Sequence, residues 1–447
     1  MHRKIFGSYD IRGMLGEDIN SDFAYKLGAA FGAYLCPDQS GTFVVGHDAR
    51  ESSPGLAAAI AQGLVERGHH VRSIGLASTP LVYWWGGKTG GDGSLVVTAS
   101  HLPLEYNGFK LCRKGAAPIS AGTGLLDIQA LMNASLPVTD LAAGSVTHEK
   151  PLEEYAACLS GFLKAPAPLR IAVDAGNGAA GPEIAPVFRQ HPQIEVIEIG
   201  CVPDIRLAQR PSNPLEHGAL DHLAEVVLAR DCAFGMAFDG DADRAVVVDN
   251  EGKMVPGDFL IPLIARQILA DRQGASVLYD LRASRVVAEK IKDYGGKPVR
   301  TRVGHSFIKA AMREHAAVFG GELSGHYYYA DLYCADSALR TLMEIVNLVS
   351  AESMSLSELL VPMRKYATSG EINLSIEDVA AMLESLRQSF SDGSCDHLDG
   401  LSIDYPDWWF NARGSQTEPL LRICIGAARP ALLDEKRELV LSLVRRS

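Results

Sequence analysis

A run of six residues, Asp239-Gly240-Asp241-Ala242-Asp243-Arg244, follows a short apolar segment and holds three carboxylates at alternate positions. In an extended or looped backbone, side chains at i, i+2 and i+4 can converge on one point, whereas on a helix positions i and i+2 face apart. Three adjacent carboxylates repel one another unless a cation lies between them, and oxygen ligands suit a hard cation such as Mg²⁺. The run therefore predicts a metal-binding loop at the end of a strand.

Other interpretations of this run fit less well. An EF-hand loop also begins Asp-x-Asp-x-Asp, but it requires Gly at position 6 and Glu at position 12, where this chain has Arg244 and Asn250. An aspartyl-phosphate phosphatase would use Asp239 as its nucleophile, near the start of its catalytic domain, and would leave Ser100 without a role. A solvated acidic turn rarely follows a buried strand with such tight spacing.

A second candidate site is Thr98-Ala99-Ser100-His101, with Lys110 ten residues after the serine. A serine at the end of a buried strand, with a histidine beside it, could be a nucleophile, although a serine in such a turn is more often a cap. The following Asn107-Gly108 step indicates a sharply shaped loop.

Two further runs carry polar groups suited to ligand binding. In Gly321-Glu322-Leu323-Ser324-Gly325-His326, three hydrogen-bonding side chains alternate, as a sugar-binding loop or a capped turn would require. The run Arg413-Gly414-Ser415-Gln416-Thr417-Glu418-Pro419, with Arg422 close by, combines guanidinium groups, hydroxyls and a glycine. It could be a phosphate cradle or a polar hairpin loop.

The elements that must position these loops are short apolar runs, which recur along the chain. Three of them end in aspartate, at 44–48, 171–174 and 277–280, and each precedes a helix-like segment. One such segment, 56–67, has Ser53-Pro54 at its start and Gly68 at its end. A second set of apolar runs ends in the polar residues at 95–100, 235–239 and 317–322. Short buried strands alternating with helices indicate an α/β fold, whose ligands collect at the carboxyl ends of strands.

The C-terminal part differs, because strand-like runs dominate it and helix-like stretches lie near 376–390 and 433–445. The sequence thus predicts three similar α/β domains with mixed sheets plus a smaller C-terminal α+β domain. The predicted ranges are 1–147 with the serine loop, 148–253 with the acidic loop, 254–365 with the sugar-binding loop and 366–447 with the phosphate-binding loop.

Composition narrows the class of protein. The chain has 447 residues and a formal charge of −12, which argues against a nucleic-acid binder. It contains no apolar run of about 18 residues and no signal peptide, so we expect no membrane segment. Its eight cysteines are scattered and form no C-x-x-C pair, which predicts reduced thiols and a cytoplasmic location.

Taken in order, these runs resemble the α-D-phosphohexomutase family, and within it the bacterial phosphomannomutase/phosphoglucomutase group. The resemblance covers essentially the whole chain and rests on the runs at 9–13 (Tyr9-Asp10-Ile11-Arg12-Gly13), 98–101, 106–110, 239–244, 321–326 and 413–419. It implies four domains around a central cleft and a reaction in which a phosphoserine and a hexose 1,6-bisphosphate exchange a phosphoryl group.

The resemblance also implies a role for each candidate residue. Ser100 would carry the phosphoryl group, and one Mg²⁺ would be held by Asp239, Asp241, Asp243 and an oxygen of the phosphorylated Ser100. Glu322, Ser324 and His326 would select the sugar. The non-reacting phosphate would be anchored by Arg413, Ser415, Gln416, Thr417 and Arg422. Around the transferring phosphate would lie Arg12, Lys110, Arg244, Arg282 and His305, with Tyr9 and His101 lining the same site.

The expected activity is interconversion of mannose 6-phosphate and mannose 1-phosphate by a monomer, with a hexose 1,6-bisphosphate as activator and hexose phosphates as its only partners. The alternative is specificity for glucose phosphates or for both sugars. A sugar-phosphate phosphatase and a non-catalytic sugar-phosphate binder are less favoured. Which of Arg12, Lys110 and His305 moves the proton stays open. The chain departs from the family pattern at Leu102, Gln416 and Arg282, and Leu102 could alter the packing of the serine loop.

Overall fold

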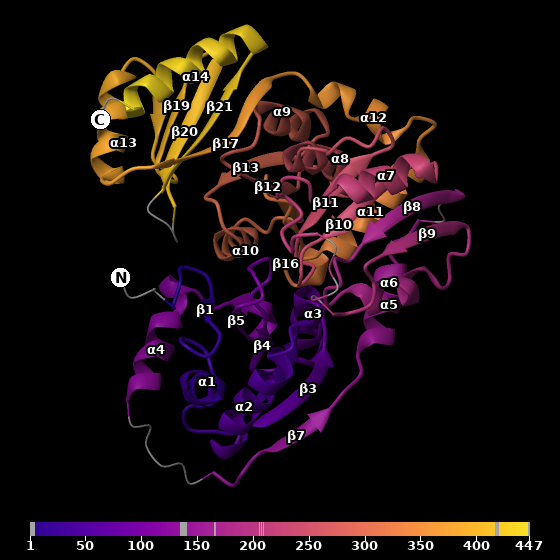
Figure 1. The fold of residues 1–447 in the computed structure, drawn as a ribbon, viewed down its shortest axis with the longest axis vertical. Helices are drawn as coiled ribbons and strands as arrows, with labels where there is room; N and C mark the ends of the chain where they lie inside the picture. Colours follow the sequence, from indigo (N-terminus) through magenta and orange to yellow (C-terminus); the bar gives the residue numbers. More distant parts are fainter. Residues whose placement is uncertain are drawn as a thin grey trace.

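The computed structural model describes residues 5–134, 141–164, 167–204, 206, 208, 210–415 and 420–445. Four β-sheets follow one another along the chain, and in Figure 1 they form two lobes, with the first sheet below and the fourth at the top. The fold class predicted from the sequence is confirmed, because three mixed sheets with helices precede an antiparallel one at the C-terminal end.

The first sheet has the order β1-β5-β4-β2-β3-β7, with β6 beside β5. Its strands are β1 (Ile11–Met14), β2 (Thr42–His47), β3 (His70–Leu76), β4 (Gly93–Val97), β5 (Tyr106–Arg113), β6 (Ala117–Pro118) and β7 (Ser145–His148). The helices are α1 (Ser21–Leu35), α2 (Ser53–Glu66), α3 (Thr79–Thr89) and α4 (Leu125–Asn133). Along β2, Phe43 and Val45 belong to one core and Val44 to another, so the sheet is buried on both faces.

The second sheet has the order β11-β10-β8-β9 and is parallel except for β11. Its elements are α5 (Leu152–Ser160), β8 (Leu169–Asp174), α6 (Gly181–Phe188), β9 (Ile194–Ile199), α7 (Asp221–Ala229), β10 (Phe234–Phe238) and β11 (Ala245–Asp249). All five residues of β10 are buried, and the strand ends directly before Asp239, so a fully buried strand presents the acidic loop.

The third sheet has the order β13-β12-β14-β15-β16. Its strands are β12 (Ser276–Asp280), β13 (Lys297–Thr301), β14 (Phe319–Gly321), β15 (Tyr327–Tyr329) and β16 (Ala335–Asp336). The helices are α8 (Gly257–Ala270), α9 (Arg285–Asp293), α10 (His305–Glu314), α11 (Ala338–Ala351) and α12 (Leu356–Leu359). The predicted runs ending at Asp48, Asp174 and Asp280 correspond to β2, β8 and β12, which occupy equivalent places in the three sheets.

The fourth sheet is antiparallel with the order β17-β21-β20-β19-β18. Its elements are β17 (Ala367–Ser375), α13 (Val379–Ser389), β18 (Ser394–Asp396), β19 (Leu401–Asp404), β20 (Trp408–Gly414), β21 (Leu420–Ala427) and α14 (Pro430–Arg445). On β20, Phe410 and Ala412 pack with residues of the two helices, whereas Asn411 and Arg413 face the cleft. The polar face of this sheet is therefore turned toward the other domains.

The domain limits at 147, 253 and 365 remain predictions. The first of them falls inside β7, which pairs with β3 of the first sheet. Across the described ranges, each helix is too short or too polar to span a bilayer.

Candidate functional site

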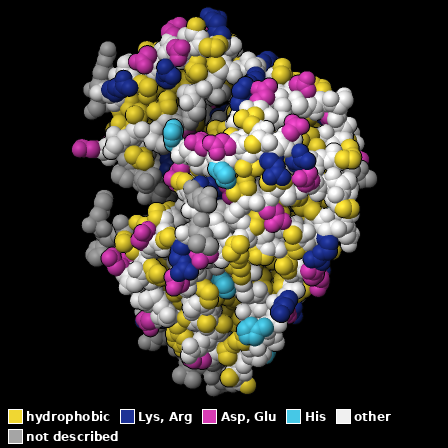
Figure 2. Space-filling view, turned by 45° about the vertical axis from the view of Figure 1, so that its right-hand side comes forward, with side chains coloured by type: hydrophobic (Ala, Val, Ile, Leu, Met, Phe, Trp, Pro, Cys, Tyr) yellow, Lys and Arg dark blue, Asp and Glu magenta, His cyan; other side chains and the backbone are white. Residues whose placement is uncertain are grey.

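A cleft of about 850 Å³ lies where the loops of the four sheets meet. In Figure 2 the molecule is hollowed between its upper and lower lobes, beside charged side chains of both signs. The predicted site residues on its wall are Tyr9, Arg12, Ser100, His101, Lys110, Asp243, Arg244, Arg282, His305, Glu322, Ser324, His326, Arg413, Ser415 and Arg422. Asp239 and Asp241 lie just behind that wall, and Gln416 and Thr417 fall outside the described residues.

Ser100 follows β4 in a sharp turn, where its φ of +53° puts it in the left-handed region that side chains rarely adopt. Its N–H donates to Thr98 Oγ1 at 2.8 Å. Its hydroxyl donates to Asp239 Oδ2 at 2.9 Å and lies 3.2 Å from His101 Nδ1. The turn thus aims the hydroxyl of the first sheet at the acidic loop of the second.

A buried arginine holds this turn in shape. Arg50 pairs with Asp48 and donates to four main-chain carbonyl oxygens of the loop, those of Ser100 (3.1 Å), Leu102 (2.6 Å), Pro103 (2.8 Å) and Tyr106 (3.0 Å). Because these bonds are made to main-chain oxygens, they do not involve the side chain at position 102, and they hold the loop with Leu102 in this place.

The acidic loop curls so that its three carboxylates meet. Ala242 has a φ of +56°, and ligand oxygens of Asp239, Asp241 and Asp243 all lie within 4.8 Å of one another. Asp241 Oδ2 accepts hydrogen bonds from the Thr79 hydroxyl at 2.6 Å and from Lys110 Nζ at 2.7 Å, and Lys110 also contacts Asp243. The second oxygens of Asp241 and Asp243 are buried without a hydrogen-bond partner among the described residues. An all-oxygen trio with such open positions fits a hard divalent cation.

The charge balance of the trio supports the same conclusion. Burial and the neighbouring Asp243 and Asp241 raise the pKa of Asp239 to about 7. Burial opposes the ionisation of Lys110 as well, but Asp241 and Asp243 raise its pKa well above the ordinary value, so the ammonium stays charged. The Lys110 ammonium and the Arg244 guanidinium, which lies 3.6 Å from Asp239, together balance two of the three carboxylates. A further positive charge would relieve the third.

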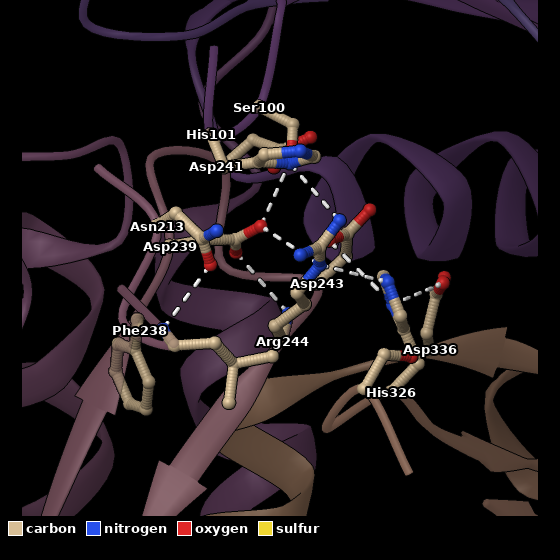
Figure 3. Close-up of polar contacts among 12 residues, drawn as sticks. Ser100, His101, Asn213, Phe238, Asp239, Asp241, Asp243, Arg244, His326 and Asp336 are labelled. Atoms are coloured by element: carbon tan, nitrogen blue, oxygen red, sulfur yellow. Dashed lines mark hydrogen bonds and ion pairs between the residues drawn. The ribbon is translucent and has the colours of Figure 1, made fainter. Parts of the chain in front are cut away.

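Arg244 is the centre of a polar network, which Figure 3 shows below Ser100 and His101. Its Nη2 lies 2.9 Å from His101 Nδ1, its Nε donates to His326 Nε2 at 3.0 Å, and it lies 3.6 Å from Asp239. Because a guanidinium only donates, His326 Nε2 must accept, and the proton of the neutral ring sits on Nδ1. That atom lies 3.3 Å from Asp336, which in turn pairs with Lys309 at 2.7 Å.

Two histidines of the cleft are neutral at physiological pH. Burial and the charges of Arg244 and Arg12 hold the pKa of His101 well below its usual range. Burial and Lys309 lower the pKa of His305 to about 3. The ring of Tyr9 packs 5.5 Å from that of His305, and its hydroxyl donates to the Val303 carbonyl oxygen. Both rings are therefore uncharged and each keeps one unprotonated nitrogen, unlike the nearby cations, although a low pKa makes that nitrogen a weak base.

The predicted sugar-binding loop connects to the start of α10. Glu322 is buried and accepts hydrogen bonds from the Gly304 N–H at 2.7 Å and from the Tyr328 hydroxyl at 2.9 Å. Ser324 Oγ lies 3.4 Å from the same carboxylate. Glu322 is thus fixed at the cleft wall, beside the histidines.

Cationic side chains gather at two places in the cleft. Near the serine loop, Arg12 pairs with Asp10 at 2.8 Å. At the fourth sheet, Arg413 and Arg422 stand opposite each other on β20 and β21, and Arg282 approaches from the loop after β12. The Ser415 N–H donates to the Leu420 carbonyl oxygen at 2.8 Å. The second group can bind a phosphate.

Sequence reasoning missed the residues that support these groups: Arg50, Thr79, Lys309, Asp336 and Glu371. Two of them had a usable signal. Thr79 follows Ser78, the N-cap of α3, in a Ser-Thr-Pro step typical of a helix start, and Arg50 comes two residues after the strand-ending Asp48. The contacts of the others depend on tertiary structure alone.

The chain matches three domain families described as phosphoglucomutase/phosphomannomutase, alpha/beta/alpha domains I, II and III, over residues 3–135, 153–252 and 256–366. A phosphomannomutase from Escherichia coli is 36% identical, covering 98% of this chain and 99% of the relative. Phosphohexose mutases of Xanthomonas campestris pv. campestris are 37% identical over 97% of both chains. The crystal structure of a phosphoglucomutase/phosphomannomutase family protein from Burkholderia thailandensis superposes with a TM-score of 0.89 at 30% identity, covering 99% of this chain and 96% of that one.

Proposed function

Because the chain belongs to the α-D-phosphohexomutase family, we propose that it interconverts mannose 6-phosphate and mannose 1-phosphate through a phosphoserine at Ser100. Family membership makes it an isomerase that moves a phosphoryl group within its substrate. One observation carries the assignment of residues, namely the hydrogen bond of 2.9 Å from the Ser100 hydroxyl to Asp239 of the carboxylate trio.

The proposed reaction has two mirrored halves. In the first, the bond between phosphorus and Ser100 Oγ breaks while the free hydroxyl oxygen of the hexose phosphate bonds to that phosphorus. The hydroxyl proton leaves for a base, the released Ser100 oxygen takes up a proton, and the product is a hexose 1,6-bisphosphate. After this intermediate reorients, Ser100 takes its other phosphoryl group by the reverse step. The same intermediate, supplied from outside, would phosphorylate an idle enzyme and act as its activator.

Positioning and charge neutralisation supply most of the rate in such transfers. Asp239, Asp241 and Asp243 would hold one Mg²⁺, which when bound neutralises charge on the transferring phosphoryl group. Lys110, Arg12 and Arg244 add fixed positive charges around Ser100. Ser100 is only 1% exposed, and this burial keeps water away from the phosphoester.

His305 is the residue we assign to accepting the substrate proton. It lines the cleft, and its Nε2 has no hydrogen-bond partner among the described residues, so that nitrogen is open to the substrate hydroxyl. Arg12 and Lys110 are held in their charged forms by Asp10 and by the trio, so they cannot take up a proton. His305→Gln is expected to lower kcat far more than it changes KM.

We assign the sugar to the loop of Glu322, Ser324 and His326, and the non-reacting phosphate to Arg413, Ser415 and Arg422, with Gln416 and Thr417 between them. Mannose is favoured because the named relatives with high identity include phosphomannomutases. Phosphoglucomutase activity or dual specificity is the alternative. All eight cysteines are free thiols, which supports a reducing, cytoplasmic environment for a monomeric enzyme.

A single assay tests the proposal. The purified protein is incubated with mannose 1-phosphate, Mg²⁺ and a trace of hexose 1,6-bisphosphate, and sugar phosphates and free phosphate are measured. We expect mannose 6-phosphate, loss of turnover in Ser100→Ala, and full turnover in a control with the exposed Ser391 replaced by alanine. Net release of inorganic phosphate would indicate a phosphatase. An active Ser100→Ala variant would show that the reaction does not pass through a phosphoserine at this position.

A further inference from the structure

Glu371 is the common partner of the three arginines at the proposed phosphate site. Its Oε2 accepts from Arg413 Nη2 at 2.9 Å and from Arg282 Nη1 at 3.2 Å, and its Oε1 accepts from Arg422 Nη1 at 3.3 Å. The carboxylate is only 19% exposed and lines the cleft. A single side chain thus joins guanidinium groups from the third and the fourth sheet.

The local backbone is shaped to bring this carboxylate into the cleft. The pairing of β17 with β21 shifts register between Thr368 and Glu371, and Gly370 in the resulting bulge has a φ of +66°. The Ser369 hydroxyl accepts from the Ile425 N–H at 3.0 Å, which fixes the bulge. Bulges commonly re-aim a side chain next to a functional site.

Counting charges shows what Glu371 does for the cluster. Asp280 binds Arg282 through two hydrogen bonds, of 3.2 and 2.7 Å, and compensates that guanidinium. Arg413 and Arg422 face each other across a β-pair, and Glu371 accepts a hydrogen bond from each of them. Because like charges directly opposite are destabilising, this shared carboxylate helps to keep both side chains in one place before a phosphate arrives.

Glu371 is not needed to attach the fourth sheet to the third. Arg285 of the third domain binds Asp404 at 2.7 Å and the carbonyl oxygens of Tyr405 and Trp408, and its guanidinium lies over the Trp409 ring. These contacts lie on other strands of the fourth sheet. The consequence of losing the Glu371 carboxylate should therefore fall on the three guanidinium groups and not on the docking of the sheets.

We propose that Glu371 is a positioning residue that preassembles the phosphate site, holding Arg282, Arg413 and Arg422 from two domains in one binding arrangement. The proposal deepens the proposed function, since it concerns the anchor for the non-reacting phosphate of the same substrate. Each arginine gives Glu371 a hydrogen bond through one of the five N–H groups of its guanidinium. The three side chains are thus held together at the wall of the cleft, where a phosphate can reach them.

The test compares Glu371→Gln with the wild-type protein and with Glu377→Gln, an exposed glutamate in the turn after the same strand. Binding of mannose 6-phosphate and of inorganic phosphate is measured by calorimetry on dephosphorylated protein, where no turnover occurs. Charge-assisted hydrogen bonds contribute enough that we expect Kd to rise about tenfold or more for both ligands. KM should rise by a similar factor with kcat nearly unchanged, and the control should match the wild type.

Three results would overturn the proposal. A lower Kd in Glu371→Gln would make the carboxylate a competitor of the phosphate. An unchanged Kd would show that Glu371 does not contribute to phosphate binding. A loss confined to kcat would show that it acts on the reaction step and not on the phosphate site. If the glutamine variant does not fold, Glu371→Asp serves instead, with a smaller rise in Kd expected and no rise refuting the idea.

A double-mutant cycle with Arg282→Lys locates the effect between the domains. If Glu371 positions Arg282, the two substitutions together should weaken binding by clearly less than the product of their separate effects. Independent effects would contradict the positioning role. Since the binding measurements do not depend on turnover, a protein that binds but does not isomerise would refute the proposed function and leave this inference standing.

Discussion

The substitution Arg50→Lys tests how far the shape of the serine loop controls the reaction. Arg50 is 3% exposed, and its side chain makes five hydrogen bonds, one to Asp48 and four to main-chain oxygens of residues 100–106. A lysine ammonium has three donors, so at least two buried acceptors lose their partner. At about 1–3 kcal/mol for each, the substitution removes roughly 2–6 kcal/mol of stabilisation, concentrated on the turn that holds Ser100.

Part of that loss should appear as misplacement of the Ser100 hydroxyl. An error of about 1 Å in a reacting group can lower a rate about a hundredfold. We therefore expect kcat of Arg50→Lys to fall by about ten- to a hundredfold. KM should stay within about twofold, because Arg282, Glu322 and Arg413 contact other loops.

The assay follows mannose 1-phosphate conversion at a temperature well below Tm, with intact-mass measurement of the phosphorylated fraction. The matched control is Arg72→Lys, on β3 of the same sheet, whose side chain is 35% exposed and reaches Glu149 only at 3.7 Å. Circular dichroism shows whether both variants fold. An Arg50→Lys variant with wild-type kcat and Tm would refute the reasoning, and so would a loss confined to KM.

Three further predictions concern other parts of the structure. Thr79→Val removes the hydrogen bond of 2.6 Å to Asp241, and we expect the Mg²⁺ concentration for half-maximal activity to rise about tenfold, with Thr79→Ser restoring it; an unchanged metal titration would count against this. Burial and Arg67 lower the pKa of His69 to about 4, and its Nδ1 accepts from the Gly41 N–H, so the unfolded chain takes up a proton there before the folded one does. The free energy of unfolding should therefore fall between about pH 6.5 and pH 4, by up to about 3 kcal/mol from this group. In the His69→Gln variant, the midpoint of urea unfolding should depend less steeply on pH over the same range. Arg422→Ala should mainly raise KM for the hexose phosphate, measured in the same assay, whereas a pure kcat loss would contradict its assignment to the anchor.

The parts of the fold and site that the sequence predicted are those encoded by neighbouring residues. The strands before Asp48, Asp174 and Asp280 are buried apolar runs, and such runs can be recognised in the sequence without knowledge of the tertiary structure. The acidic trio lies within five residues, so its convergence needs only one curled loop. The resemblance to the family added the order of the loops around the cleft.

Contacts between distant residues could not be predicted in this way. Thr79 and Asp241 are 162 positions apart, and Glu371 and Arg282 are 89 apart, so no local period links them. The bulge at residues 369–370 aims Glu371 into the cleft, yet in the sequence it appears only as a serine before a glycine. Their pairing follows from how the sheets are packed.

Burial is the property that gives these supporting residues their importance. Lys309 and Asp336 are each 1% exposed, and a charge removed from water to that degree is stable only beside an opposite charge. On an exposed surface the same pair would contribute little. Asp336 also faces His326, so removing the Lys309 charge would leave a buried carboxylate whose nearest remaining partner is a ring that Arg244 already engages. A change at Lys309, which touches neither Ser100 nor the trio in the described contacts, would therefore be transmitted to the reacting groups through Asp336, His326 and Arg244.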